Sequence, residues 1–248
     1  MSWRVIVLVG LLAFSGALLA VWPARWATGL LPSIVRCQDW RGTVWRGQCR
    51  QLTVAMPGEP PLTIETAGWT LHPAPLLHGR LAADVALTDM RGDATGHVEL
   101  ARGGLLVLRG VSARMLLDPR MPSALPAGWR GRAEMQQLEL DWQSSQLRHL
   151  QGQLQLSDLR DEQGHDLGNY RLDFPPATAP PFRGAITDQG GPLQLRGTLE
   201  LTADRRWSLA GTVAARAGAD PAITQYLDAL GAADAAGRYP LSAAGTFR

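Results

Sequence analysis

The stretch Leu193-Gln-Leu-Arg-Gly-Thr-Leu-Glu-Leu201 alternates apolar and polar residues almost without fault. Leucines point one way, and Gln194, Arg196, Thr198 and Glu200 point the other. Because successive side chains of a β-strand point to opposite faces, this period of two predicts a strand with one apolar and one polar face. The same alternation returns at residues 207–213 after a polar step, so the two segments predict an antiparallel hairpin.

Similar alternation recurs at residues 96–117, 137–142 and 147–159. Helical patterns are scarce. The clearest covers residues 220–231, with Asp220 as N-cap and a terminal glycine, and a shorter turn is expected at 73–78. We therefore expect a mainly β chain: a curved, mostly antiparallel sheet domain, open or a sandwich, with a short C-terminal helix. A proline-rich run at 174–181 suggests a possible division of that domain.

The N-terminal segment VIVLVGLLAFSGALLAVW, residues 5–22, contains no charge. As a helix it would span about 27 Å, close to the apolar thickness of a bilayer. Cleavage after Ala20 or Ala24 would place bulky Leu18 or Trp22 at a position that signal peptidase sites fill with small residues. These poor sites favour an uncleaved transmembrane helix over a signal peptide.

The orientation of this segment in the membrane does not follow from charge alone, because the arginines after it oppose a simple positive-inside count. They are Arg25, Arg36, Arg41, Arg46 and Arg50. Long domains cross a membrane largely regardless of charge, whereas a head of four residues has little to translocate. We expect residues 1–4 to be cytoplasmic, residues 5–22 to span the membrane, and residues 23–248 to form a periplasmic domain.

The composition excludes several function classes. The 24 basic residues are all arginine and face 22 acidic residues, so there is no basic surplus of the kind that nucleic-acid binding requires. The absence of lysine removes Schiff-base chemistry and the phosphate-loop lysine. We find no nucleophile elbow, phosphate-cradling loop or set of metal ligands at the usual spacing. The sequence predicts no enzyme, no cofactor and no metal.

Cys37 and Cys49 are the chain's two cysteines. They are disulfide candidates, and the alternative is two buried thiols. A metal site is disfavoured because no histidine or third cysteine lies at ligand spacing. A symmetric hairpin closed by this pair would turn near Gly42–Thr43. A turn at Arg46–Gly47 looks equally good, and would separate the two sulfurs.

The acidic stretch SDLRDEQGHD, residues 157–166, does not match a calcium loop and is typical of a solvated hairpin tip. The tryptophans are more informative about candidate sites than this stretch. Several fall in or near expected strands: Trp40, Trp45, Trp69, Trp129, Trp142 and Trp207. Core packing is their ordinary role. The alternative is a partner surface, for which the candidates are Trp45, Trp69 and Trp129.

Several short motifs occur in an order that resembles the general secretion pathway protein N family of type II secretion systems. They are the apolar segment, Arg41-Gly-Thr-Val-Trp-Arg-Gly47, the stretch 68–79, the stretch 187–195 with Trp207, and the tail from Leu230 to Arg238. The positions that carry the resemblance are Gly42, Trp45, Gly47, Trp69, Gly190, Gly191 and Trp207.

The resemblance implies a single-pass inner-membrane protein of a Gram-negative bacterium with its bulk in the periplasm. It would assist export of folded proteins across the outer membrane, with other secretion-system components of either membrane as partners, and it would have no catalytic residues. The β-rich domain also resembles AsmA-like proteins, whose curved sheets present an apolar groove. The alternative function is therefore periplasmic lipid binding or lipid transport.

Overall fold

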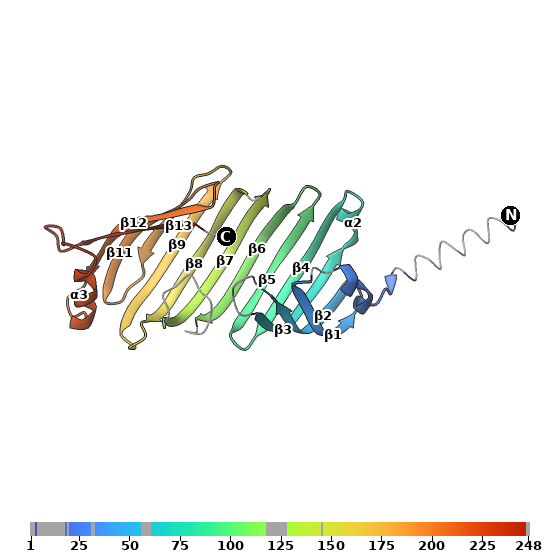
Figure 1. Cartoon of the computed structure of the whole chain (residues 1–248), viewed down its shortest axis with the longest axis horizontal. Coiled ribbons are helices and arrows are strands. Elements are labelled where there is room, and N and C mark those ends of the chain that lie inside the picture. The colour runs from blue at the N-terminus through green and yellow to red at the C-terminus, as the bar shows by residue number, and fades with distance from the viewer. Residues whose placement is uncertain are drawn as a thin grey trace. The chain divides into compact units, whose positions relative to one another are not determined.

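The computed structural model describes residues 3, 18, 20–30, 33–55, 61–117, 128–144 and 146–246 (Figure 1). The chain forms two compact units, Met1–Met90 and Arg91–Arg248. The expected membrane segment lies outside the described residues except at 18 and 20–22. Within the part of the chain that is described, no helix is both long and apolar enough to cross a membrane.

The first unit contains an antiparallel meander in which each strand pairs with the next. Its elements are η1 (Ala24–Leu30), β1 (Val35–Gly42), β2 (Arg46–Val54), β3 (Leu62–His72), α2 (Pro73–Leu76) and β4 (Arg80–Asp89). The expected helical turn at 73–78 is thus a short helix that begins at a proline, where the missing N–H has no cost.

The second unit is a longer antiparallel meander. Its elements are β5 (Gly92–Ala101), β6 (Leu105–Leu117), β7 (Arg130–Gln143), β8 (Gln146–Arg160), β9 (Asp166–Ala177), β10 (Phe182–Asp188), β11 (Leu193–Leu201), β12 (Arg206–Ala215), α3 (Pro221–Asp228) and β13 (Tyr239–Thr246). The mainly β expectation is confirmed. The strands of each unit form a single layer, so the sandwich alternative is wrong for the described residues.

The hairpin predicted at residues 193–213 is confirmed, because β11 and β12 pair from Leu193↔Ala215 to Leu201↔Trp207. In this register, apolar side chains of neighbouring strands lie beside one another on the same face of the sheet. Leu154, Leu172 and Ile186 are side-by-side partners on one face, whereas their neighbours on the other face are polar or small. One apolar face is therefore continuous from β8 to β13.

Helix α3 covers part of that face. It begins at Pro221, and the carboxylate of Asp220 accepts a hydrogen bond from the Ala222 amide at 2.9 Å, as the N-cap reading predicted. Its buried side chains Ile223 and Leu227 join a core cluster with Leu159, Leu167, Tyr170, Leu193 and Val213. The helix ends at Asp228, before the predicted limit.

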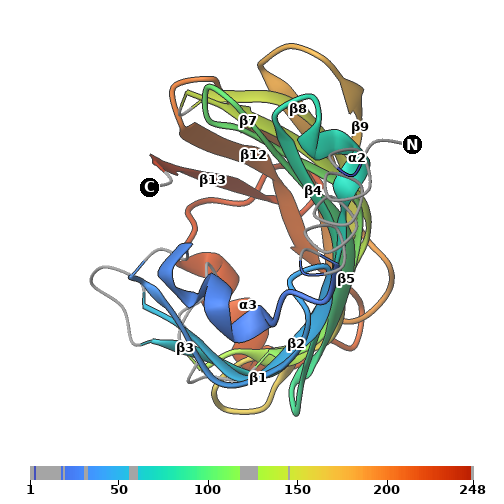
Figure 2. The same ribbon diagram turned by 90° about the vertical axis from the view of Figure 1, so that its right-hand side faces the viewer.

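The sheet of the second unit is curved, and β12 and β13 turn inward from β7–β9 (Figure 2). Gly197 and Gly211 are cross-strand partners on the apolar face. A Cβ at Gly211 would lie 2.4 Å from the Arg196 carbonyl oxygen and 2.7 Å from the Gly197 Cα. Only glycines allow β11 and β12 to approach this closely on the inner face. Residues 174–181, where the sequence suggested a division, form the end of β9 and the turn into β10.

We expect Gly211→Ala to lower the stability of the protein by about 1–3 kcal/mol, because the added methyl group meets backbone that must move. The measurement is thermal unfolding of the full-length protein in detergent. Gly68→Ala is the matched control, since its Cβ would meet the nearest atom at 3.8 Å. An unchanged melting temperature for Gly211→Ala would contradict the close strand approach.

Candidate functional site

A cavity of about 760 Å³ lies on the apolar face of the second unit. Its lining comes from β8–β13, the β8–β9 turn, α3, Leu230 and Trp129, and most of it is aliphatic. Under α3 the lining is buried. Beyond the buried core the lining is only half-buried, and it includes Leu154, Leu172, Ile186, Leu195, Leu209 and Leu241. A volume between roughly 300 and 1,000 Å³ with an apolar wall is typical of a small-molecule site.

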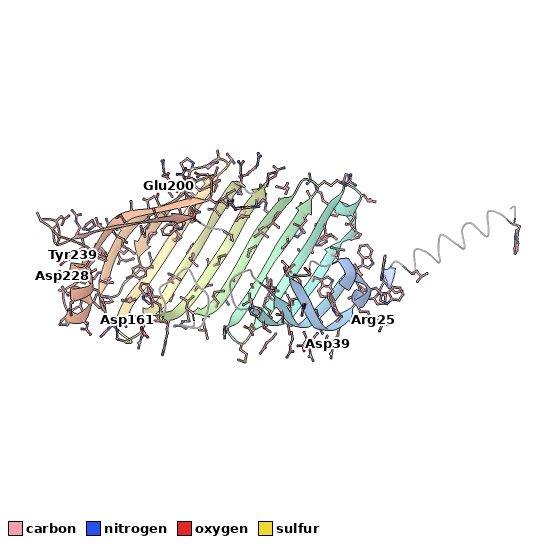
Figure 3. The ribbon with its side chains drawn as sticks, in the orientation of Figure 1. Arg25, Asp39, Asp161, Glu200, Asp228 and Tyr239 are labelled. Carbon is pink, nitrogen blue, oxygen red and sulfur yellow. A yellow bond between two sulfur atoms is a disulfide. The ribbon has the colours of Figure 1, made fainter. Side chains whose placement is uncertain are left out.

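Polar contacts at its surface hold α3 beside this cavity. The Tyr226 hydroxyl donates to Gln163 Oε1 at 3.0 Å, which ties the helix to the β8–β9 turn. The Tyr239 hydroxyl donates to Asp228 Oδ1 at 2.7 Å, which ties it to β13 (Figure 3). That contact raises the pKa of Tyr239, chiefly because Asp228 accepts the hydroxyl proton in the neutral form. The C-terminal part of α3 is thus held by two tyrosine–side-chain contacts, one to the β8–β9 turn and one to β13.

The polar end of the cavity is the β8–β9 turn. The buried Asp161 carboxylate accepts from the His165 amide and from His165 Nδ1, both at 2.8 Å. Burial alone would raise the pKa of Asp161, but the hydrogen bonds from His165 outweigh it and the pKa is lowered. The same contact raises the pKa of His165. The stretch predicted as a hairpin tip is a turn, but Asp161 is buried in it.

Tyr170 lines the buried part of the cavity. Its hydroxyl donates to the backbone carbonyl of Leu167. Burial, followed by the charge of Asp188, raises the pKa of Tyr170 to about 12, so it stays neutral at physiological pH. The hydroxyl is therefore a satisfied structural group.

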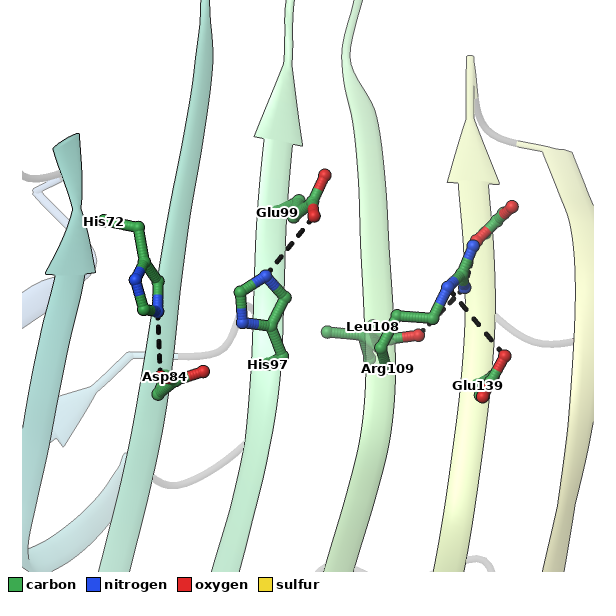
Figure 4. Close-up of polar contacts among 8 residues, drawn as sticks. His72, Asp84, His97, Glu99, Leu108, Arg109 and Glu139 are labelled. Atoms are coloured by element: carbon green, nitrogen blue, oxygen red, sulfur yellow. Dashed lines mark hydrogen bonds and ion pairs between the residues drawn. The ribbon is translucent and has the colours of Figure 1, made fainter. Parts of the chain in front are cut away.

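Polar side chains form a second group in this unit, along β5–β7 (Figure 4). His97 lies 3.3 Å from Glu99, and Arg109 lies 3.8 Å from Glu139. The hydrogen bond with Asp141 is the largest of the effects that raise the pKa of Arg109. In the first unit His72 contacts Asp84 at 2.8 Å (Figure 4). The His97–Glu99 pair lies within β5, whereas the other two pairs join neighbouring strands. Partly exposed ion pairs of this kind contribute little net stability each.

The motif residues of the first unit build one hairpin turn. Gly42 has a φ of 86°, and a Cβ there would lie 2.5 Å from the Arg46 carbonyl oxygen. At Gly47 a Cβ would lie 2.5 Å from the Trp69 ring, so the glycine makes room for that ring. Trp69 Nε1 donates to the Val44 carbonyl at 2.9 Å and its ring packs edge-on against Trp40, with centroids 5.7 Å apart.

Neither predicted turn position is correct for this hairpin. Gly42 pairs with Gly47, and the Thr43 amide donates to the Arg46 carbonyl at 2.9 Å, so the chain turns at Val44–Trp45. Cys49 consequently lies opposite Trp40, and not opposite Cys37. The two cysteines are nevertheless joined, with Cα atoms 5.9 Å apart. Gln51 lies in β2 between Cys49 and the residue that faces Cys37, and its φ of 53° interrupts the regular strand there. This distortion accompanies the diagonal bridge.

The other motif residues pack in the second unit. Gly191 lies against Gly168, where a Cβ would be 2.4 Å from the facing Cα, and Gly190 accepts a hydrogen bond from the Asn169 amide at 2.9 Å. The Trp207 ring lies over Gly245. Trp129 packs on the core beneath α3. Trp45, Trp69 and Trp129 are each half-buried, and their role as a partner surface stays a prediction.

Sequence reasoning raised an apolar groove only as what the AsmA-like resemblance implies, and it did not locate this cavity or the residues that line it. The leucines that line it were assigned to one face of their strands, but no pattern in one strand says which part of that face a helix will cover. The available signal was the isolated amphipathic helix between the last two strands, together with the glycines that interrupt the leucine alternation at Gly197 and Gly211.

The described site defines an antiparallel β-sheet protein with an apolar cavity under a short helix. The family is given by comparison: the protein-family model for type II secretion system protein N matches residues 34–242, from just before β1 into β13. The chain belongs to this family, which is that of a secretion-system component and not a known enzyme family. Neither a curated protein nor a solved structure matches the chain.

Replacing both cysteines, Cys37→Ser with Cys49→Ser, should destabilise the β1–β2 hairpin, because the unfolded chain regains the freedom that the closed loop removes. In the chain-entropy model the loss is about 3 kcal/mol. Hydrogen exchange followed by mass spectrometry should show faster exchange at residues 35–54 and unchanged exchange in β8–β12. Unchanged exchange at 35–54, or maleimide labelling of the unreduced wild type, would contradict a stabilising bridge.

The Asp161–His165 pair predicts a pH window of stability. The raised pKa of His165 gives stabilisation that is complete below its ordinary value of 6.5 and is lost as the pH rises through the raised value. The lowered pKa of Asp161 gives stabilisation that is complete above 3.8 and is lost as the pH falls through the lowered value. The melting-temperature difference between wild type and Asp161→Asn should therefore be greatest between pH 3.8 and 6.5.

Glu65→Gln serves as the control for that measurement, because Glu65 is an exposed carboxylate on β3. The melting-temperature difference between Glu65→Gln and the wild type should not be greatest between pH 3.8 and 6.5. A difference for Asp161→Asn that stays constant from pH 4 to pH 9 would show that this pair does not couple folding to protonation.

Proposed function

We propose that this chain is an accessory component of the type II secretion system that assists export of folded proteins across the outer membrane. The single observation that carries the proposal is the family match over residues 34–242, which includes β1 to β12 completely and the first half of β13. A non-enzymatic role is proposed with it, because the family is that of a machinery component. Its partners would be other components of the same system.

We further propose that residues 5–22 hold the chain in the inner membrane, with residues 1–4 cytoplasmic and residues 23–248 periplasmic. The exposed side chains of Val21, Trp22 and Trp26 support this, since tryptophan is enriched at membrane interfaces. The Val44 amide donates to the Trp22 carbonyl at 2.9 Å, so the end of the apolar segment is joined to the hairpin turn. The Cys37–Cys49 bridge suits an oxidising compartment.

The outer edge of β13 is the proposed contact for a partner in strand addition. Among the described strands β13 pairs with β12 alone, which leaves one row of its backbone groups available. Pro240 in this strand limits uncontrolled pairing, because proline cannot donate a ladder hydrogen bond. Trp45, half-buried in the β1–β2 turn, is the second proposed contact.

Deletion of the gene should lower the amount of type II substrates in the culture medium, while the same proteins accumulate in the periplasm. A photo-crosslinking amino acid placed at Ser242 on β13, or at Trp45, should capture a secretion-system component in living cells. The matched control is Thr198, an exposed residue on β11, which is paired on both sides.

Unchanged secretion after deletion, together with the absence of captured secretion-system components from both positions, would overturn the proposed function. Equal capture from Thr198 would overturn the choice of β13 as the contact.

A further inference from the structure

The half-buried part of the cavity needs an apolar occupant. Six aliphatic side chains contribute to it, one from each of six adjacent strands: Leu154, Leu172, Ile186, Leu195, Leu209 and Leu241. An ordered water requires two to four polar partners, and this part of the wall offers none. Since burying apolar area is worth about 25 cal/mol per Å², a ligand with an extended hydrocarbon body would gain most from this wall.

The polar lining residues gather at one end of the site. Asp161, Glu162 and Gln163 are consecutive in the β8–β9 turn and all contribute to the lining. A long apolar wall with polar groups at one end matches an amphiphile that has a hydrocarbon chain and a single headgroup. It does not match a compact polar metabolite, whose hydrogen-bonding groups would be left without partners.

The charge at that end selects the headgroup. Asp161 is already bonded to His165, whereas Glu162 is exposed and forms no ion pair with the other described residues. Asp220 at the start of α3 lies 4.0 Å from His165, so Asp161 and Asp220 share one histidine and Glu162 remains as the carboxylate without an ion pair among the described residues. Arg171, the basic residue of the lining, is paired with Asp173 at 2.8 Å. The rim therefore favours an ammonium group and disfavours a lone carboxylate or phosphate.

We propose that the second unit binds one acyl chain of a zwitterionic phospholipid that carries an ammonium headgroup. The chain lies along the six aliphatic residues, and the headgroup lies at the β8–β9 turn beside Glu162. Helix α3 covers the part of the acyl chain next to the headgroup, because the Tyr226 hydroxyl donates to Gln163 in the β8–β9 turn. This site goes beyond the secretion role, and its failure would leave the family-based proposal unchanged.

The probe is a palmitoyl lysophosphatidylethanolamine with a diazirine near the end of its chain, added to full-length protein in amphipol. After irradiation, mass spectrometry should find adducts on peptides of β11–β13 that contain Leu195, Leu209 or Leu241. Leu195→Trp fills the cavity and should reduce the adducts at least about fivefold, because the variant binds the probe more weakly at this site. Thr198→Trp, on the opposite face of the same strand, should leave them unchanged.

Melting temperatures of both variants are measured alongside, and Leu241→Phe replaces Leu195→Trp if the latter does not fold. Adducts confined to other regions, or equal labelling of a folded cavity-filled variant, would overturn the proposal. Palmitate, which has the same chain with a carboxylate, should reduce the adducts less than unlabelled lysophosphatidylethanolamine does. In Glu162→Gln the two competitors should differ less than they do in the wild type. Equal competition by palmitate in the wild type would overturn the assignment of the headgroup.

Discussion

The apolar face of a single-layer sheet must be covered, and the structure of the second unit depends on how this chain meets that constraint. Hydrogen bonds between neighbouring strands satisfy the backbone, but they leave one row of leucines after another on the same face. The chain covers this face with its own side chains, by placing large residues beside glycines. Phe174 lies over Gly184, and Trp207 lies over Gly245, so rings fill space that a Cβ would occupy. The same arrangement recurs in the first unit at Trp69 and Gly47.

Glycines on the inner face also set the curvature. Strands that bend toward their apolar face crowd the side chains there, and Gly197 and Gly211 remove the crowding where β11 and β12 come closest. Helix α3 then covers the end of the curved face with Ile223 and Leu227. It is too short to cover the remainder, so an apolar wall remains beyond it. The cavity is a consequence of a curved sheet being longer than its helical cover.

The alternation at residues 193–213 was sufficient to predict a hairpin and the faces of its side chains, because the period of two is a local property of the backbone. The helix near residue 220 was predictable for the same reason, since Asp220 and Pro221 act on their own neighbours. The hairpin between Cys37 and Cys49 was not. Gly42 and Gly47 both look like turn residues, whereas the structure places them as the last pair of the ladder and turns at Val44–Trp45. Trp69, a strand away, decides that arrangement by packing on Gly47.

The sequence by itself determined the strand class, the two faces of each strand and the family to which the chain is similar, because each of these is written in neighbouring residues and their order. Only the tertiary structure decided that Cys37 reaches Cys49 across a distorted strand, that Asp161 is buried at a turn, and that the leucines of five strands meet around one cavity. The physical reason is register. A strand's own residues define which way each side chain points, but the residues that it meets come from other strands and from α3, and these are fixed only when the sheet curves and the helix packs.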